Sequence, residues 1–233
     1  MVIATALIQN WFLRVSYPIR ETCFMPKKRT ERLLTGIPEK GIENSVPEWK
    51  IENVVATAEV EFDAPGDRIE LNQIAFTYTD CDYNPERFPG LCMRVQDPKA
   101  TILIFSTGKM VITGLRQASD ADIIINNVMK KMKKARVRVK NEPKITIQNI
   151  VASGDLHVSI DLDKAFLIME NTMYEPEVFP GLIYRMQEPK VVFLIFRTGR
   201  LVCTGGKTKE IVGEAVLKLA EQIKNHELIR GIK

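Results

Sequence analysis

The sequence is poor in the residues that build metal centres, disulfide frameworks and common hydrolytic sites. It has only four cysteines and two histidines among 233 residues. The cysteines show no C-x-x-C spacing, so neither a zinc ribbon nor a disulfide framework is predicted, and a reducing, intracellular setting fits best. His157 and His226 lie in no H-E-x-x-H motif and in no triad-like setting. We therefore expect no enzyme, no catalytic residue, no metal and no cofactor.

Long hydrophobic runs are also absent. No apolar run reaches the roughly 18 to 20 residues that span a bilayer, so no membrane partner is predicted. The opening MVIATALIQNWFL is apolar, but it lacks the basic start and the cleavage site of a secretory signal. Residues 1–47 are interpreted as an N-terminal extension that is either disordered or wrongly included. MPKKRTERL at Met25 is a plausible start in its own right, and mass spectrometry of the natively expressed protein would decide between the two.

Charge of one sign does not dominate the chain. The formal net charge is +4, and residues 1–47 contribute seven Lys/Arg against four Glu, which is +3 of that total. The rest is almost neutral, so net charge alone does not identify a nucleic-acid binder. The basic run at 27–29 is open to three interpretations: a targeting signal, a phosphate-binding patch or a solvated tail.

The sequence contains an internal repeat. Residues 83–114 laid over 174–205 without a gap give 19 identities in 32 positions, at an offset of 91 residues. Upstream, IENVVAT (51–57) matches IQNIVAS (147–153) at an offset of 96, so the first copy has five extra residues around DAPGD (63–67). A period of about 90 residues is too long for a solenoid unit. We predict two copies of one structural half, 48–138 and 139–233.

Each copy has the same predicted order of elements: a strand, a short helix, a run of strands and a long helix. TILIFS (101–106) and VFLIFR (192–197) are β-branched and aromatic, and the turns STGK and RTGR lead into the next strands as hairpins. Apolar residues at 124, 125, 128, 129 and 132 predict a helix over 118–135 with Ser119 as its cap, and those at 212, 216, 219 and 223 predict a helix over 207–225. The predicted fold class is α+β, with antiparallel strands and the long helices on one face.

The other face of the predicted sheet has no helix to cover it. A large uncovered apolar surface normally marks a binding site, and alternate residues of a strand share one face. This alternation places on the open face Asn53, Val55, Thr101, Leu103, Phe105, Lys109, Val111 and Thr113 from the first copy and Asn149, Val151, Val192, Leu194, Phe196, Arg200, Val202 and Thr204 from the second.

The doubled motifs resemble the TATA-box-binding protein family. The resemblance rests on FPGLCMR and FPGLIYR, on PKATILIFSTGKMVITG and PKVVFLIFRTGRLVCTG, and on the two copies of the I-x-N-x-V-A motif, and it covers about residues 48–230. It implies a saddle-shaped monomer with two pseudo-symmetric repeats, one curved antiparallel sheet and helices on the convex face. The concave face would bind the minor groove of TATA promoter DNA and nucleate transcription initiation. The overall pattern is archaeal.

The resemblance also implies roles for individual residues. Phe88 with Phe105, and Phe179 with Phe196, match the family's two pairs of wedges, which unstack a base step at either end of the site; this family is itself a standard example of such binding. Hydrogen-bonding and groove-lining contacts to base edges match Asn53, Val55, Leu103, Val111, Thr113, Asn149, Val151, Leu194, Val202 and Thr204.

Two further groups of residues are predicted to serve DNA or a protein partner. Glu175, Glu177 and Val178 match the family's second loop, where transcription factor B docks before RNA polymerase joins; an exposed acidic loop is the alternative. The basic segment 129–140 could bind DNA, bind a regulator or form a solvated helix face. Candidate phosphate contacts, each of which could also be ordinary solvated surface, are Arg87, Arg94, Lys99, Lys109, Arg185, Lys190 and Arg200.

Other classes of function fit the sequence less well. GKT at 206–208 resembles the end of a phosphate-binding loop, but Leu201 occupies the position of the required earlier glycine. No residues remain for a separate catalytic domain, and no small-molecule substrate is expected. The alternative is a saddle-shaped module that binds protein or RNA without TATA specificity. The predicted location is cytoplasmic and nucleoid-associated for an archaeal protein, and nuclear for a eukaryotic one.

Overall fold

The order of strands and helices repeats along the chain. The computed structural model describes residues 47–62, 67–137 and 143–232, all within one compact unit, 42–233. Predictions for the possible start at Met25, the basic run at 27–29, most of the DAPGD insertion and the end of segment 129–140 lie outside these residues. We call residues 48–134 half 1 and residues 144–232 half 2. Half 1 consists of β1 (Glu48–Glu59), α2 (Leu71–Thr77), β2 (Cys81–Asp82), β3 (Gly90–Gln96), β4 (Lys99–Phe105), β5 (Lys109–Leu115) and α3 (Asp120–Lys134).

Half 2 has the corresponding elements, and the described residues there include a further strand pair, whose half-1 counterpart would fall at 138–141, outside the described residues. The short strands β7 and β12 pair with each other in a separate two-stranded sheet. Half 2 consists of β6 (Lys144–Asp155), β7 (Val158–Ile160), α4 (Leu162–Ile168), β8 (Thr172–Met173), β9 (Gly181–Met186), β10 (Val191–Phe196), β11 (Arg200–Gly206), α5 (Lys209–Asn225) and β12 (Ile229–Ile232).

The two halves share one ten-stranded antiparallel sheet. Its strand order is β2-β3-β4-β5-β1-β6-β11-β10-β9-β8, which reads the same from both edges once the halves are exchanged. The halves join where β1 pairs with β6 over nearly the whole length of both strands, from Glu48 opposite Asp155 to Glu59 opposite Lys144. Because this central pairing is made of backbone hydrogen bonds, the sheet is continuous across the pseudo-twofold axis. The predicted α+β fold class is confirmed.

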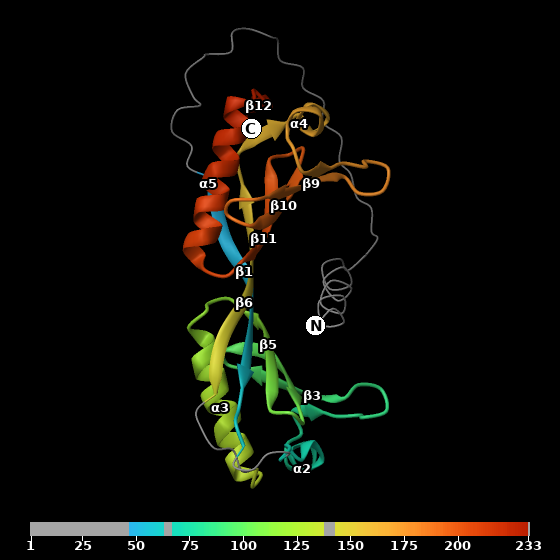
Figure 1. The fold of residues 1–233 in the computed structure, drawn as a ribbon, viewed down its shortest axis with the longest axis vertical. Helices are drawn as coiled ribbons and strands as arrows, with labels where there is room; N and C mark the ends of the chain where they lie inside the picture. The colour runs from blue at the N-terminus through green and yellow to red at the C-terminus, as the bar shows by residue number, and fades with distance from the viewer. Residues whose placement is uncertain (1–46, 63–66, 138–142, 233) are drawn as a thin grey trace, which may run out of the picture. The chain divides into compact units, whose positions relative to one another are not determined.

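The long helices cover one face of this sheet (Figure 1). Buried side chains of α3 and α5 correspond one to one at the repeat offset of 91 residues, for example Ile124 with Ala215 and Met132 with Ile223. The predicted helical spacing is therefore correct, although Met129 is only partly buried. Ser119 occupies the predicted cap position of α3 but makes no side-chain cap hydrogen bond, whereas the corresponding cap of α5, Thr208, accepts one from the Ile211 N–H.

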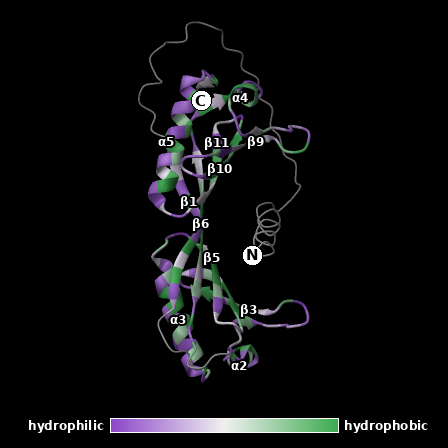
Figure 2. Ribbon diagram, in the orientation of Figure 1, coloured by the Kyte–Doolittle hydropathy of each residue, from purple (hydrophilic) through white to green (hydrophobic). Residues whose placement is uncertain are grey.

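The distribution of hydrophobic side chains distinguishes the face of the sheet that the helices cover from the open face. Figure 2 shows hydrophobic residues concentrated in the strands, with much of α3 and α5 hydrophilic. In β4 the side chains that face the helices, Ile102 and Ile104, are fully buried, and in β10 Phe193 and Ile195 take the same places. Burying such a side chain contributes about 1.5 to 3 kcal/mol to the free energy of unfolding. Most of the core therefore lies between the sheet and the helices, and no helix among the described residues covers the opposite face (Figure 1).

Candidate nucleic-acid interface

The open face carries the residues that the alternation predicted for it. Leu103 and Phe105 in β4 and Leu194 and Phe196 in β10 are half-buried, whereas their neighbours along each strand are buried against the helices. Strand pairing aligns Leu103 with Val111, and it aligns the corresponding residues of half 2 in the same way. The result is a row of aliphatic side chains across each half that no helix covers.

Val55 and Val151 are more buried than an open-face position suggests. They are only 7% and 6% exposed, yet neither belongs to the hydrophobic core that packs against the helices. Both lie in the two central strands, where Val55 is opposite Asn149 and Val151 is opposite Asn53. Their neighbours on the open face therefore cover them, and each valine presents only a small apolar tip at the centre of the surface.

Asn53 and Asn149 hold their side-chain amides in a fixed orientation. The Asn53 Oδ1 accepts a hydrogen bond from the Gly114 N–H at 2.8 Å, and the Asn149 Oδ1 accepts one from the Gly205 N–H at 2.7 Å. Because each oxygen already accepts from the backbone, the Nδ2 group of each amide is the part left to donate. In half 2 the Asn149 Nδ2 also donates to Thr204 Oγ1 at 3.1 Å.

The N–H groups that orient these amides are available because the strands bulge. The register shifts between Val54 and Ala56 opposite β5, and between Thr204 and Gly206 opposite β6. Gly114 and Gly205 have φ values of +91° and +103°, which a side chain would make costly. Sequence analysis did not assign a role to these glycines, although both copies end in the same T-G pair.

Polar side chains also bridge the central strands. Ser153 Oγ donates to Glu52 Oε1 at 2.7 Å, and at the pseudo-symmetric place Gln148 Nε2 donates to Thr57 Oγ1 at 2.8 Å. The hydrogen bond from Ser153, followed by the interaction with Lys50, lowers the pKa of Glu52 below its usual value. Glu52 therefore stays ionised at neutral pH.

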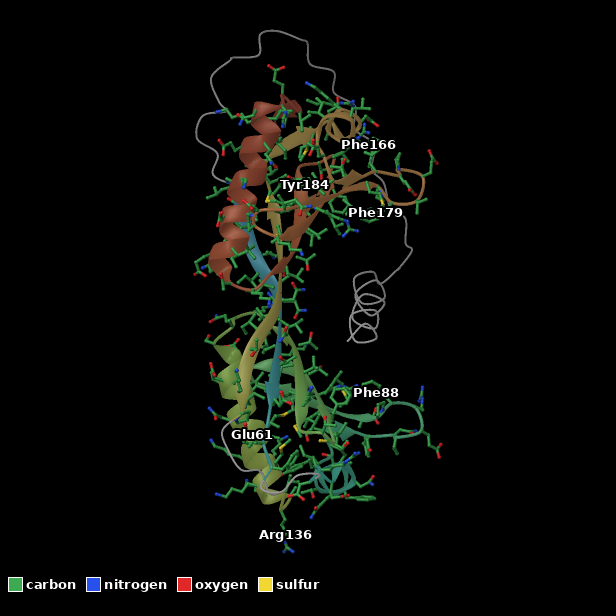
Figure 3. All side chains as sticks on the ribbon, viewed as in Figure 1. Glu61, Phe88, Arg136, Phe166, Phe179 and Tyr184 are labelled. Atoms are coloured by element: carbon green, nitrogen blue, oxygen red, sulfur yellow. The ribbon has the colours of Figure 1, made fainter. Side chains whose placement is uncertain are left out.

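Each half carries a pair of phenylalanine rings on the open face. The rings of Phe88 and Phe105 (pair 1) lie 5.8 Å apart with their planes inclined by 65°, and those of Phe179 and Phe196 (pair 2) have the same separation and inclination. Figure 3 shows Phe88 and Phe179 where the long loops before β3 and β9 reach their strands. All four rings are half-buried, so each pair presents aromatic surface to a ligand.

The glycine of each F-P-G motif makes room for these rings. A Cβ atom on Gly90 would lie 2.7 Å from Phe88 Cε1, and one on Gly181 would lie 2.6 Å from Phe179 Cε1. The second ring of each pair would be about as close, with Phe196 Cε1 at 3.1 Å from the same Gly181 atom. The repeated motif is thus a packing unit: the strand opposite Phe105 or Phe196 begins with a glycine, so that the loop phenylalanine can lie against its partner.

The predicted phosphate contacts are all exposed cations. Lys109 and Arg200 occupy equivalent places at the start of β5 and β11, and each lies near a strand carboxylate: Lys109 Nζ is 3.9 Å from Glu59 Oε1, and Arg200 Nε is 4.0 Å from Asp155 Oδ2. Such long, solvated ion pairs contribute little and leave the cations available to another anion. The full set of exposed candidates is Arg87, Arg94, Lys99, Lys109, Arg185, Lys190 and Arg200.

The loop between β8 and β9 presents the acidic residues predicted to dock a protein. Glu175 and Glu177 are exposed, and Val178 is 80% exposed. The Glu175 C=O accepts hydrogen bonds from the Val178 and Phe179 N–H groups, so the same turn fixes both the loop and a phenylalanine of pair 2. In half 1 the Asn84 C=O plays this part for Arg87 and Phe88.

Arg197 is a residue of this region that sequence analysis missed. It follows Phe196 directly, and its Nη2 lies 3.1 Å from Asp163 Oδ2 in α4. A hydrogen bond with Tyr174, followed by nearby carboxylates, raises the pKa of Arg197. Half 1 has Ser106 at the equivalent position. The difference between the RTGR and STGK turns was visible in the sequence, but the contact with α4 was not.

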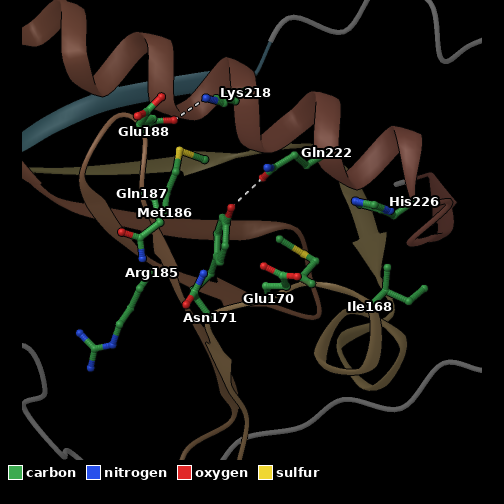
Figure 4. A pocket seen from close by; sticks show the side chains of 12 residues that line it. Ile168, Glu170, Asn171, Arg185, Met186, Gln187, Glu188, Lys218, Gln222 and His226 are labelled. Atoms are coloured by element: carbon green, nitrogen blue, oxygen red, sulfur yellow. Dashed lines mark hydrogen bonds between the residues drawn. The ribbon is translucent and has the colours of Figure 1, made fainter.

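A pocket of about 470 Å³ lies beside α5 in half 2 (Figure 4). Tyr184 OH donates to Gln222 Oε1 at 3.1 Å, and Lys218 Nζ donates to the Glu188 C=O at its rim. Arg185 also lines the pocket, but its side chain extends away from α5. Lys131 and Asp80 form an ion pair at the corresponding place in half 1.

Two kinds of site are not found among the residues that the structure describes: a metal-holding cluster and a membrane-spanning helix. Within residues 47–62, 67–137 and 143–232, no three His, Cys, Asp or Glu side chains are grouped so that they could hold a metal ion. In the same ranges no helix has both the length and the apolarity needed to cross a membrane. Burial raises the pKa of the Cys203 thiol to about 12 and that of Cys81 to about 11, so neither is a thiolate at neutral pH.

An uncovered sheet face with aromatic pairs, oriented amides and peripheral cations defines a nucleic-acid-binding module. Comparisons with known proteins identify the family to which this module belongs. The family model described as transcription factor TFIID, or TATA-binding protein, matches residues 48–135 and 144–226. The TATA-box-binding protein of Aeropyrum pernix is 47% identical over 186 residues, which cover 80% of this chain and 89% of that one. That of Pyrobaculum aerophilum is 47% identical over 178 residues, which cover 76% and 87%.

A solved structure agrees with these relatives. The Methanococcus jannaschii TATA-binding protein superposes with a TM-score of 0.69 at 43% identity, covering 77% of this chain and 99% of that one. This chain belongs to the TATA-binding protein family. The resemblance noted from the sequence is confirmed, as is its archaeal character. The family consists of general transcription factors and not of enzymes, and promoter DNA is the partner that membership implies.

Proposed function

We propose that this protein initiates transcription by binding the minor groove of an A·T-rich promoter element, kinking it with the two phenylalanine pairs and recruiting transcription factor B and RNA polymerase. The observation that carries the proposal is the geometric identity of the two pairs, with ring centroids 5.8 Å apart and planes at 65° in both halves. Two equivalent aromatic features on one open face fit a ligand that has its own near-twofold symmetry, as duplex DNA does.

The apolar centre of the open face accounts for a preference for A·T pairs. In the minor groove an A·T pair shows only acceptors, whereas a G·C pair adds an amino donor. Val111 and Val202 cannot accept a hydrogen bond from that donor, so a G·C pair above them leaves the donor unsatisfied. The Nδ2 groups of Asn53 and Asn149 donate to the acceptors of A·T pairs, because their oxygen atoms are held by the backbone.

The phenylalanine pairs act as wedges at the two ends of the element. A ring inserted between base pairs unstacks one step at a cost of a few kcal/mol, which the wider contact between bent DNA and the sheet offsets. The F-P-G glycines support this role because they allow both rings of a pair to stand against the same strand. The exposed cations at the rim then hold the phosphates and fix the register.

Binding of the full chain to a TATA-containing duplex and to a G·C-substituted control, with a dye at each DNA end, tests the proposal. We expect affinity for the TATA duplex to be higher by about 1,000-fold or more. Energy transfer should increase as the ends approach. If all seven candidate cations bind phosphate, log K should fall with log salt at a slope of about −6. Weak binding to both duplexes without bending would refute the proposal, and equal affinity for double-stranded RNA would favour the module without TATA specificity.

Transcription factor B is proposed to dock on the loop formed by Glu175, Glu177 and Val178. Two carboxylates beside an exposed aliphatic side chain suit a partner surface with basic residues around an apolar pocket. The equivalent loop of half 1 contains Asn84, Glu86 and Arg87 and lacks this combination. A partner that binds only one end would orient transcription on a nearly symmetric protein.

Replacing Val178 by arginine tests this docking surface. We expect the affinity of transcription factor B for the protein–DNA complex to fall about tenfold or more, since a new charge would be buried against an apolar contact. The affinity of the protein for DNA alone serves as the reference, and Glu86→Lys, in the equivalent loop of half 1, is the matched control. Unchanged recruitment by the Val178 variant would move the docking site elsewhere.

A further inference from the structure

The pocket beside α5 lies where half 1 has an ion pair of its own. In half 1 the Lys131 ammonium contacts the Asp80 carboxylate and lies 5.0 Å from the centre of the Tyr78 ring. At the offset of 91 residues the counterparts of these three residues, all of which line the pocket, are Gln222, Asn171 and Met169. Half 1 therefore shows which chemical group this place in the fold accommodates: an ammonium group on a methylene stem.

In half 2 the helix supplies no ammonium group at this position. Gln222 replaces Lys131, and its Oε1 accepts a hydrogen bond from Tyr184 OH at 3.1 Å. Lys218, one turn earlier in α5, donates to the Glu188 C=O at the rim. The volume of about 470 Å³ is in the range that small-ligand sites have, roughly 300 to 1,000 Å³. The place that a lysine occupies in half 1 is thus an open pocket in half 2.

A carboxylate still lies beside this pocket, shifted by one residue along the chain. Thr79-Asp80 of half 1 corresponds to Glu170-Asn171 of half 2. Figure 4 shows Glu170 and Asn171 across the pocket from α5. In the part of the chain that the structure describes, neither side chain makes a hydrogen bond or an ion pair. The Glu170 carboxylate and the Asn171 Oδ1 are therefore acceptors for the three donors of an ammonium group.

The rest of the lining suits the stem of a lysine. Met169, Tyr184 and Met186 are 7%, 7% and 3% exposed and form an apolar floor. A lysine side chain lies with its methylene groups along such a surface and keeps its charged end at polar groups. At the mouth, Ile168 is 42% exposed and its neighbour Leu167 is 83% exposed. An apolar residue next to the lysine would cover these two side chains.

We propose that this pocket docks a lysine side chain of a protein partner, in a segment where an apolar residue adjoins that lysine. The ammonium group contacts the Glu170 carboxylate and Asn171 Oδ1, and the adjoining residue packs on Ile168 and Leu167. The pocket is on the side of the sheet that the helices cover, because Tyr184 belongs to the core beneath α5. A partner held there leaves the open face free, so it binds the protein with or without DNA.

Methyl NMR of the full chain, isotope-labelled at its methionine methyl groups, tests the proposal, because Met169 and Met186 report on the pocket floor. The probe is acetyl-leucyl-lysine amide, and the control is the same dipeptide with its lysine acetylated, which keeps the stem and removes the charge. We expect saturable shifts at both methyl groups, with the acetylated peptide binding about tenfold more weakly. Equal affinity for both peptides, or no shift at either methyl group, would overturn the inference.

A charge-neutralising variant tests the role of the carboxylate. Glu170→Gln should weaken binding of the lysine peptide about tenfold, because the ammonium group loses its charged acceptor. Glu221→Gln is the matched control: it removes the same charge from an exposed residue of α5 that does not line the pocket. An equal loss of affinity in both variants would mean that the peptide responds only to net charge, and the inference would fail.

A second variant transfers the ion pair of half 1 to half 2. In Asn171→Asp with Gln222→Lys the protein's own ammonium group should fill the pocket, so the lysine peptide should no longer bind. Urea denaturation shows whether this variant folds, and wild-type affinity for the peptide in the folded variant would overturn the inference. Affinity for a TATA duplex should be the same in every variant and with saturating peptide. Failure of the proposed DNA function would appear in that measurement alone and would leave the peptide titration unaffected.

Discussion

Phe196→Ala is expected to abolish the kink at one end of the bound element while leaving the protein folded. Aromatic residues at the core of an interface contribute about 2 kcal/mol or more, so affinity for a TATA duplex should fall about 30-fold. The ring is half-buried on the face opposite the helices, and its main aromatic contact is Phe179. Energy transfer between dyes at the DNA ends measures the bend, and urea denaturation measures the free energy of unfolding.

The repeat provides a control for this experiment. Phe105→Ala, the equivalent change in half 1, should reduce bending by a similar amount at the other end of the element. A change of less than about 1 kcal/mol in the free energy of unfolding is expected for either variant, as is usual away from the core. Unchanged bending in both variants would show that the phenylalanine pairs are not wedges, whatever the affinity.

Phe193→Ala is expected to produce the opposite result. Phe193 lies three residues before Phe196 in the same strand but faces α5; it is fully buried, and its ring stacks on Tyr184 at 6.5 Å with an interplanar angle of 14°. Truncating a buried phenylalanine costs about 3 to 5 kcal/mol through lost burial and the cavity it leaves. Urea denaturation should show this loss with an unchanged m-value.

That loss is a large part of the 5 to 15 kcal/mol that typically holds a domain together. If Phe193→Ala does not fold, Phe193→Leu offers a milder truncation at the same place, for which a loss of about 1 kcal/mol or more is expected. DNA bending by the folded Leu variant should remain near that of the wild type. A loss well below 1 kcal/mol in both variants would mean that the core of half 2 does not depend on this side chain.

The two halves differ at the ends of the interface. Arg197 joins the β10–β11 turn to α4 through Asp163, and Val178 is exposed in the loop that leads to Phe179. Half 1 has Ser106 and Arg87 at these positions. The central strands, in contrast, keep in both halves the hydrogen bond from a glycine N–H to an asparagine Oδ1. Differences at the ends suit partner choice and direction, whereas the conserved geometry at the centre suits a shared mode of DNA contact.

The sequence by itself determined the repeat, the class of fold and the face that each strand residue takes. These follow from local rules: the period of two in a strand separates Leu103 from Ile104, and the helical spacing of apolar residues predicted the buried face of α5. The four phenylalanines were also singled out from the sequence, because they recur at matched positions of a doubled motif and match the family's wedges, and their role as wedges stays a prediction.

Only the tertiary structure decided how these residues are held. Gly114 orients the Asn53 amide, and Gly181 makes room for two rings. Both effects depend on distances between segments that are remote in the chain. The near-complete burial of Val55 likewise follows from its place in the pairing of β1 with β6, more than ninety residues away. Local patterns determine which face of the sheet a side chain takes. Bulges and strand pairing determine which residues it contacts, because those contacts exist only once β1 and β6 have paired across the pseudo-twofold axis.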